Sequence, residues 1–277
     1  MRWHTGSPDG RTLAFVALDR IWIMDLPDGS PRRLTGERSN AQEYSPAWSP
    51  DGRLIAFTTW SDDEGGALWT AAVSGEAPSK LTEVDGMYRS PTWSPDGTSI
   101  VVARGSGEML RGRLPSDEPW FTLEQVPSHG GQAMRIGEVL AARGSHVVAP
   151  EFGPDGRIFF VEAGEGFRSI KLDGTDIRTH AVIEASDEAT ASPDGRWIAF
   201  SRGDNMYLTP MNWPGASGEP IEISVESAPW PVTTLSQNGG NFPNWAGPGI
   251  LEWGSANSYF RHDVASGEID TVEVRLE

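Results

Sequence analysis

The histidines and nucleophiles of this sequence do not form a recognisable catalytic pattern. The five histidines are His4, His129, His146, His180 and His262, and no two have the i, i+2 or i, i+4 spacing that directs both imidazoles to one metal ion. There is no Gly-x-Ser-x-Gly elbow and no Gly-Lys-Ser/Thr phosphate loop. We therefore expect isolated histidines, no catalytic residue and no cofactor, although a fold could bring distant histidines together.

Metal binding has one further candidate, the acidic run Asp62-Asp63-Glu64-Gly65-Gly66. Carboxylates in a flexible turn can hold Ca²⁺, but this run lacks the alternating ligand spacing of a calcium loop. A solvated hairpin is the preferred interpretation, and Ca²⁺ is the alternative. The sequence has no cysteine, which excludes disulfides and thiolate metal sites.

Aromatic and basic residues supply the candidate recognition groups. Of the 12 tryptophans, one set recurs at equivalent places (Trp48, Trp93 and Trp245; Trp22, Trp69 and Trp120) and is expected to pack between structural units. Three tryptophans fall outside that register, and two arginines lie in a long Gly-, Arg- and Glu-rich segment. The resulting candidate binding residues are Trp60, Arg111, Arg113, Trp213 and Trp230.

The elements that would position these residues follow from a repeat. Ser-Pro-Asp-Gly begins at Ser7, Ser49, Ser94 and Ser192, with Gly153-Pro154-Asp155-Gly156 as a variant and Trp245-Ala246-Gly247-Pro248-Gly249 as an eroded copy. Pro presets the first turn position, Asp bonds its own downstream backbone and Gly accepts a positive φ. Intervals of roughly 40 to 60 residues fit one four-stranded blade per repeat.

Apolar, β-branched and aromatic runs follow each turn, as in Leu54-Ile55-Ala56-Phe57. Such runs are typical of strands buried on both faces. The sequence predicts an all-β, six-bladed β-propeller of four-stranded antiparallel blades, in one domain over 1–277. The expected blades are 1–40, 41–85, 86–143, 144–185, 186–238 and 239–277. Each blade would be contiguous in sequence, so ring closure would rest on packing between the first and last blades.

Two intervals are long and locate candidate functional loops, Gly105 to Pro119 and Trp213 to Trp230. Long loops in a compact fold are often functional, and we expect both at one rim of the propeller. The formal net charge of −17 argues against nucleic acid and anionic membrane surfaces as partners. The sequence contains no apolar run of about 20 residues, so membrane insertion is not expected.

The pattern Pro-x-Trp-Ser-Pro-Asp-Gly, followed by Ile-Ala-Phe, Leu-Trp and Leu-Thr, resembles the TolB-like family of WD-type propeller repeats. Segments such as Arg20 to Pro27, Asn238 to Trp245 and Ser258 to Val264 resemble more narrowly the propeller portion of bacterial amidohydrolase-related proteins. There a propeller precedes a metal-dependent barrel. This resemblance implies a propeller without its enzyme, and it transfers no catalytic residue, because the sequence has no His-x-His.

The expected function is a non-catalytic binding or scaffold domain that docks or gates substrate for an adjoining hydrolase, or recruits a protein partner. A peptide or small molecule in the central channel is a further expected ligand. One alternative is a stand-alone propeller enzyme or lectin with a site at the channel mouth. Another is a TolB-like periplasmic interaction module, although such a module would be expected to carry an additional amino-terminal domain. The resemblance favours a periplasmic or extracellular location.

Overall fold

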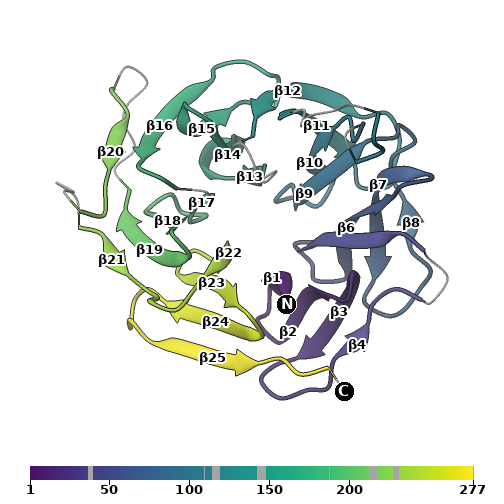
Figure 1. Ribbon diagram of the computed structural model, residues 1–277, viewed down its shortest axis with the longest axis horizontal. Helices are drawn as coiled ribbons and strands as arrows, with labels where there is room; N and C mark the ends of the chain where they lie inside the picture. The colour runs from purple at the N-terminus through teal and green to yellow at the C-terminus, as the bar shows by residue number, and fades with distance from the viewer. Residues whose placement is uncertain are drawn as a thin grey trace.

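The computed structural model describes residues 1–36, 40–108, 110–113, 119–141, 148–186, 188–211, 218–226 and 231–276. Its strands form six sheets that follow one another around a ring (Figure 1). The predicted all-β, six-bladed propeller is confirmed, since each blade contains a four-stranded antiparallel meander. Among the described residues no helix is long and apolar enough to cross a membrane.

Each blade runs from an inner strand at the ring centre to an outer strand at the periphery (Figure 1). The inner strands are β1 (Arg2–Gly6), β5 (Gln42–Trp48), β9 (Met87–Trp93), β13 (Glu151–Phe152), β17 (Glu188–Ala191) and β22 (Asn241–Gly247). The second strands are β2 (Thr12–Ala17), β6 (Leu54–Ser61), β10 (Ser99–Gly105), β14 (Ile158–Glu162), β18 (Trp197–Arg202) and β23 (Ile250–Ser255).

The third and outer strands complete the blades. The third strands are β3 (Arg20–Asp25), β7 (Gly65–Ala72), β11 (Trp120–Pro127), β15 (Gly166–Ile170), β19 (Asn205–Pro210) and β24 (Ser258–Asp263). The outer strands are β4 (Arg32–Arg33), β8 (Ser79–Lys80), β12 (Met134–Leu140), β16 (Arg178–Ile183), β21 (Thr233–Thr234) and β25 (Ile269–Glu273). A 3-10 turn, η1 (Pro154–Gly156), joins β13 to β14.

The Ser-Pro-Asp-Gly turn is a small hydrogen-bonded unit, seen clearly between β9 and β10. The Ser94 hydroxyl donates to the Asp96 carboxylate at 2.6 Å and accepts from the Ser99 backbone N–H at 3.0 Å. The Gly97 N–H donates to the Ser94 carbonyl at 2.8 Å, with a glycine φ of +71°. The same bonds recur at Ser7, Ser49 and Ser192, so the turn role predicted for the motif is confirmed.

The core lies between blades rather than in one central mass. Residues of β6, such as Ile55 and Ala56, are fully buried because neighbouring blades cover both faces of the strand. Ile55 and Phe57 belong to one apolar cluster with Ala14 and Ile23 of the first blade. Burial of these side chains gives each blade-to-blade interface its hydrophobic stabilisation.

The ring closes without a shared strand. The sheets of the first and sixth blades contain only their own consecutive strands, β1 to β4 and β22 to β25. The Gly6 N–H donates to the Glu252 carboxylate at 2.9 Å, and the Asn244 amide donates to the Thr5 hydroxyl at 3.1 Å. The predicted closure through contacts between first and last blades is therefore confirmed.

The fourth blade has a feature that sequence analysis did not predict. Strand β20 (Ile221–Ile223) comes from the segment between β19 and β21 of the fifth blade, yet it pairs in parallel with β16 of the fourth. The Ser224 hydroxyl also donates to the Glu184 carboxylate at 2.7 Å. This part of the long Trp213 to Trp230 interval therefore ties two blades together.

The expectation that both long loops share one rim was wrong. The loop after Gly105 joins a second strand to a third, whereas the loop after Pro210 joins a third strand to a fourth. In an antiparallel meander, successive connections lie at opposite ends of the strands. The described ends of the two loops therefore belong to opposite faces of the propeller.

Candidate binding site in the central channel

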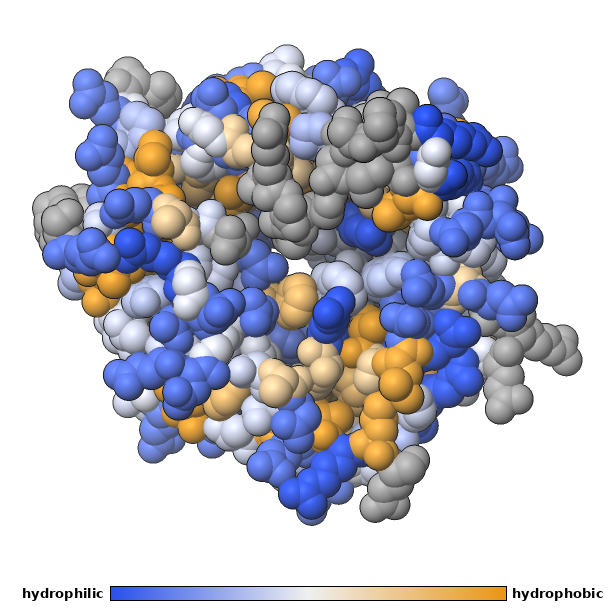
Figure 2. Space-filling model, viewed as in Figure 1, coloured by the Kyte–Doolittle hydropathy of each residue, from blue (hydrophilic) through white to orange (hydrophobic). Residues whose placement is uncertain are grey.

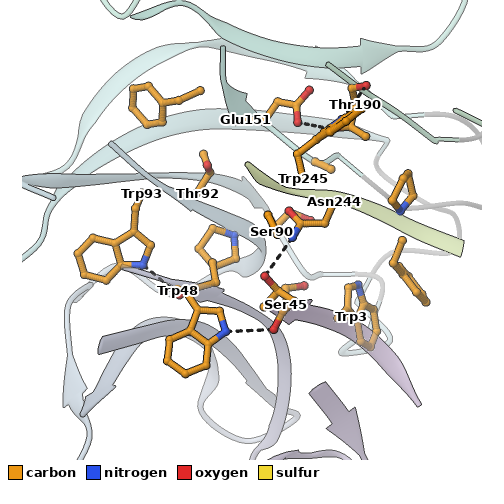
Figure 3. A pocket seen from close by; sticks show the side chains of 18 of the residues that line it. Trp3, Ser45, Trp48, Ser90, Thr92, Trp93, Glu151, Thr190, Asn244 and Trp245 are labelled. Atoms are coloured by element: carbon orange, nitrogen blue, oxygen red, sulfur yellow. Dashed lines mark hydrogen bonds between the residues drawn. The ribbon is translucent and has the colours of Figure 1, made fainter. Parts of the chain in front are cut away.

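A cavity of about 560 Å³ lies where the inner strands converge (Figure 3). Its lining comes from the ends of the inner strands and from the prolines of four Ser-Pro-Asp-Gly turns, Pro8, Pro50, Pro95 and Pro193. The cavity therefore belongs to the face on which these turns lie. Figure 2 shows one face of the molecule hollowed near the ring centre.

Four inner strands carry the same irregularity beside this cavity. In β5, Tyr44 pairs with Thr58 and Ala47 with Ala56, so two residues, Ser45 and Pro46, oppose one residue of β6. Equivalent register shifts occur in β1, β9 and β22. Each bulge holds a non-glycine residue at positive φ: Trp3 at 44°, Ser45 at 50°, Ser90 at 47° and Phe242 at 59°.

All four of these left-handed residues line the cavity. A side chain other than glycine costs about 1–2 kcal/mol in this backbone region, so the bulges store strain around the channel. Such strain concentrates at ligand-binding positions and persists only where the surrounding structure imposes it. Bulges also redirect side chains, which here point at the channel rather than continuing the strand alternation.

Aromatic rings form one wall of the site. The rings of Trp3 and Phe242 are 5.3 Å apart, which brings the first and sixth blades together. Trp3 also meets Tyr44 of the second blade edge to face at 5.5 Å. This cluster provides a broad apolar surface with defined geometry for stacking against a ligand.

Polar side chains also line the cavity, among them Ser45, Glu151 and Asn244. Ser45 is only 5% exposed, and its hydroxyl has no hydrogen-bond partner among the described residues. Glu151, on the opposite side of the ring in β13, accepts hydrogen bonds from the Thr190 hydroxyl and, at 2.7 Å, from the Ala191 N–H. Burial raises the pKa of Glu151 to about 7, although these hydrogen bonds oppose the rise.

This geometry has relatives of known fold. The PD40 family, described as the TolB beta propeller domain, matches residues 4–114, which span β1 to β10. TolB from Acinetobacter baumannii superimposes with a TM-score of 0.64 over 98% of this chain and 62% of that chain, at 16% identity. The chain has the β-propeller fold of TolB.

Two curated relatives extend well beyond this propeller. A Streptomyces coelicolor protein named as a tricorn protease homolog is 29% identical over 266 residues, covering 78% of this chain and 22% of the relative. YuxL of Bacillus subtilis, named an uncharacterized peptidase, is 28% identical over 208 residues, covering 70% of this chain and 28% of the relative. The chain spans about a quarter of the length of these relatives.

The recurring tryptophans join neighbouring blades, and for three of them an indole hydrogen bond crosses to the next blade. The Trp48 indole N–H donates to the Thr5 carbonyl at 3.0 Å, and the Trp93 indole donates to the Ala47 carbonyl at 3.0 Å. Trp245 contacts the Thr190 carbonyl in the same way at 3.5 Å. Trp22 and Trp69 make their indole hydrogen bonds within their own blades. Both nevertheless pack, as predicted, against apolar clusters that span two blades. The interpretation of Trp120 as a packing residue was wrong, because this side chain is 55% exposed.

The structure brings two of the predicted binding residues together away from the cavity. Trp60 is only 5% exposed, so it is a buried side chain and not an exposed recognition residue. The Arg111 guanidinium lies 5.5 Å from the Trp60 ring centroid and pairs with Asp85. Arg113 is exposed and lies 3.3 Å from Glu108. Trp213 and Trp230 lie outside the described residues.

The predicted sites therefore missed the residues of the channel. Trp3, Ser45, Ser90 and Phe242 all occupy the fourth position before the serine of the turn motif or its equivalent. Aligning the repeats on that serine would have marked this position, but residue types there vary too much to reveal the bulge. The bulge is therefore marked by its position in the repeat and not by residue type.

The acidic run lies in the hairpin between β6 and β7, as expected. The Trp60 indole N–H donates to the Asp62 carboxylate at 3.0 Å, which occupies one oxygen of the run. No group of three or more His, Asp or Glu suited to a metal ion occurs among the residues that the structure describes. The Ca²⁺ alternative remains a prediction.

Proposed function

We propose that this propeller is a non-catalytic binding module that serves an adjoining hydrolase and holds a peptide segment in its central channel. The observation that carries the proposal is the cavity of about 560 Å³ whose wall contains the strained residues Trp3, Ser45, Ser90 and Phe242. A volume of this size is typical of ligand pockets with apolar walls and few polar groups.

A peptide fits the chemistry of the wall better than a highly polar ligand does. Aromatic rings and prolines dominate the lining, and extended or Pro-rich segments bind in grooves of this kind. The buried Ser45 hydroxyl would satisfy its hydrogen-bonding capacity by contact with a peptide carbonyl or N–H. The bound peptide could belong to a folded protein, and the propeller would then recruit that protein by holding one of its extended segments.

The hydrolase part of the proposal rests on the relatives. Both curated relatives carry protease or peptidase in their names, and the matched region is a minor part of each. A propeller beside a catalytic domain can dock substrate or control its access. We favour a peptidase as the adjoining enzyme over the amidohydrolase-type barrel that the sequence resemblance suggests, and a periplasmic or extracellular location remains our prediction.

The test is a binding screen with a library of unstructured peptides, followed by two variants of the cavity. Ser90→Trp introduces a bulky ring into the cavity, and Trp3→Ala removes part of the aromatic wall. Trp120→Ala is the matched control, because Trp120 is exposed and does not line the cavity. We expect both cavity variants to weaken peptide binding about tenfold or more, with the control unchanged.

The alternatives predict other outcomes in the same assay. Binding that is unaffected by either cavity variant would place the ligand elsewhere on the propeller and overturn the channel site. A lectin or enzyme would instead bind oligosaccharides or turn over a substrate without any adjoining domain. Absence of peptide binding together with either result would reject the proposed function.

A further inference from the structure

The side chain of Arg89, beside the channel, has no paired carboxylate among the residues that the structure describes. Arg89 lies in β9 directly before Ser90 and is half-buried. Its Nη1 atom is enclosed and has no hydrogen-bond partner, and no carboxylate pairs with Arg89 within the described ranges of the chain. The cavity is lined by β9 from Ser90 to Trp93, so Arg89 borders the inner limit of this lining.

The guanidinium of Arg89 is held in place by stacking. It lies over the Tyr44 ring of the second blade, 4.9 Å from the ring centroid. Tyr44 is fixed in turn by its hydroxyl, which donates to the Gln42 side chain, and by its edge contact with Trp3 in the cavity wall. A cation–π contact orients a guanidinium but leaves its N–H donors free to bind other groups.

An arginine in this state is costly for a folded protein. Burial lowers the pKa of Arg89, with partial compensation by Tyr44, because the charged form loses hydration without gaining an anion. The chain contains 39 Asp and Glu residues, and many other arginines pair with them. A shortage of acidic residues therefore does not account for the unpaired guanidinium.

Charged groups of both signs lie near the same tyrosine. Burial raises the pKa of the Tyr44 hydroxyl; the charge of Arg89 and the weaker influence of Arg2 oppose that rise, whereas Asp19 and Asp62 add to it. Arg2 is exposed on the neighbouring inner strand β1. Arginine at −5 from the turn serine thus occurs in two nearby blades, the first and the third.

We propose that Arg89, oriented by Tyr44, forms a carboxylate-binding subsite at the inner limit of the channel cavity. This proposal rests on the proposed function, in which a peptide occupies that cavity. The guanidinium fork matches a planar carboxylate and can bind it with two parallel hydrogen bonds. The net charge of −17 favours a monoanion over a doubly charged phosphate. The carboxylate would come from an Asp or Glu side chain or from a peptide C-terminus.

The direct test uses acetate as the probe on the unmodified protein. Nuclear magnetic resonance of the arginine guanidinium groups should show saturable shifts of Arg89 as acetate is added, with no equivalent shift of the exposed Arg53, whose side chain is 85% exposed. Chloride at equal ionic strength is the control for screening. Absence of a saturable Arg89 shift overturns the subsite, whether or not any peptide binds.

Peptides then distinguish the two sources of the carboxylate. The tightest peptide from the screen is compared with its C-terminal amide and with versions in which Glu or Asp is replaced by Gln or Asn. We expect one of these neutral versions to bind about tenfold more weakly, and Arg89→Gln to remove that difference. Arg53→Gln is the matched control and should leave the difference unchanged.

The outcomes separate this inference from the proposed function. Peptide binding that is lost in Ser90→Trp but indifferent to Arg89→Gln and to every carboxylate supports the channel and overturns the subsite. Acetate shifts at Arg89 without any peptide binding support the subsite and reject the peptide. If Arg89→Gln fails to fold, the acetate titration of the unmodified protein still decides the question.

Discussion

The Glu252 carboxylate accepts a hydrogen bond of 2.9 Å from the backbone N–H of Gly6, and so joins the sixth blade to the first. Glu252 is fully buried, and it also accepts from the Tyr259 hydroxyl at 2.5 Å and from the Asn244 amide at 3.3 Å. The first and sixth blades share no strand at this seam. The hydrogen bonds of Glu252 therefore help to hold the two blades together in place of strand pairing.

Replacing the seam carboxylate should weaken the whole propeller. In Glu252→Ala the Gly6 N–H and the Tyr259 hydroxyl lose their acceptor inside the protein, which costs about 2–4 kcal/mol of the free energy of unfolding. Urea unfolding measures this change. Glu273→Ala is the control, because Glu273 is exposed and should change stability by less than about 0.5 kcal/mol. Equal effects of the two variants would show that the seam does not depend on Glu252.

Gly6→Ala tests the same contact between the first and sixth blades, because it adds a methyl group beside the Glu252 carboxylate. A Cβ at this glycine would lie 2.4 Å from the Glu252 carboxylate oxygen, so the carboxylate or β1 must move. We expect destabilisation of about 1–3 kcal/mol. In the double variant Gly6→Ala, Glu252→Ala the two costs should fall short of their sum, because the clash disappears with the carboxylate. Strict additivity in urea unfolding would contradict the contact.

A buried histidine makes the seam sensitive to acid. His4 is 3% exposed, neither ring nitrogen has a partner within the described residues, and burial lowers its pKa from 6.5 to about 3. The folded state thus binds fewer protons than the unfolded state. The stability contribution is fully present above pH 6.5 and is lost as the pH falls from 6.5 towards 3.

His4→Leu should therefore flatten the pH dependence of stability. Between pH 6.5 and 4 the variant should lose less stability than the unmodified protein, by on the order of a few kcal/mol. Unfolding curves over this range give the measurement. His129→Leu, at an exposed position, should follow the unmodified curve. A variant curve with undiminished slope would mean that His4 is not the titrating group.

Glu151 should give the opposite pH dependence of stability to that of His4. Its pKa is raised from 4.5 to about 7, so the folded state favours the protonated form, and its contribution to stability is lost as the pH rises through 7. Glu151→Gln keeps an acceptor for the Ala191 N–H, and its amide N–H group can donate to the Thr190 hydroxyl, which donates to the carboxylate in the unmodified protein. We expect the variant to match the unmodified protein at pH 5 and to be more stable at pH 8. Lower stability at both values would contradict this assignment.

The turn serine can be tested in one blade against another. Ser94→Ala removes the hydroxyl that bonds both Asp96 and the Ser99 N–H, which should cost about 1–3 kcal/mol in urea unfolding. The hydrogen bond from Ser94 is the main cause that lowers the pKa of Asp96 to about 2, so the variant should raise that pKa in a carboxyl titration. Ser49→Ala in the second blade, where the hydroxyl makes the same two bonds with Asp51 and the Leu54 N–H, is the comparison and should lose a similar amount of stability. An unchanged Asp96 pKa would refute the role of the hydroxyl.

The sequence by itself determined the repeat and the strands that it punctuates. The Ser-Pro-Asp-Gly turn closes through bonds between residues at most five apart, such as Ser94 to Ser99, so local chemistry is sufficient to specify it. Six such turns and the apolar runs after them predict six blades, and contiguous blades predict a seam without a shared strand. These are the features that the structure confirms.

Only the tertiary structure decided the candidate site. The contacts of Trp3 with Tyr44 and Phe242 join different blades, and the left-handed backbone at Trp3 and Phe242 has no residue-type signature. The burial of Trp60 under Arg111 and the parallel pairing of β20 with β16 likewise depend on the neighbouring segments in space. The physical reason is range: a turn is stabilised within a few residues, whereas a channel wall exists only after distant strands have come together.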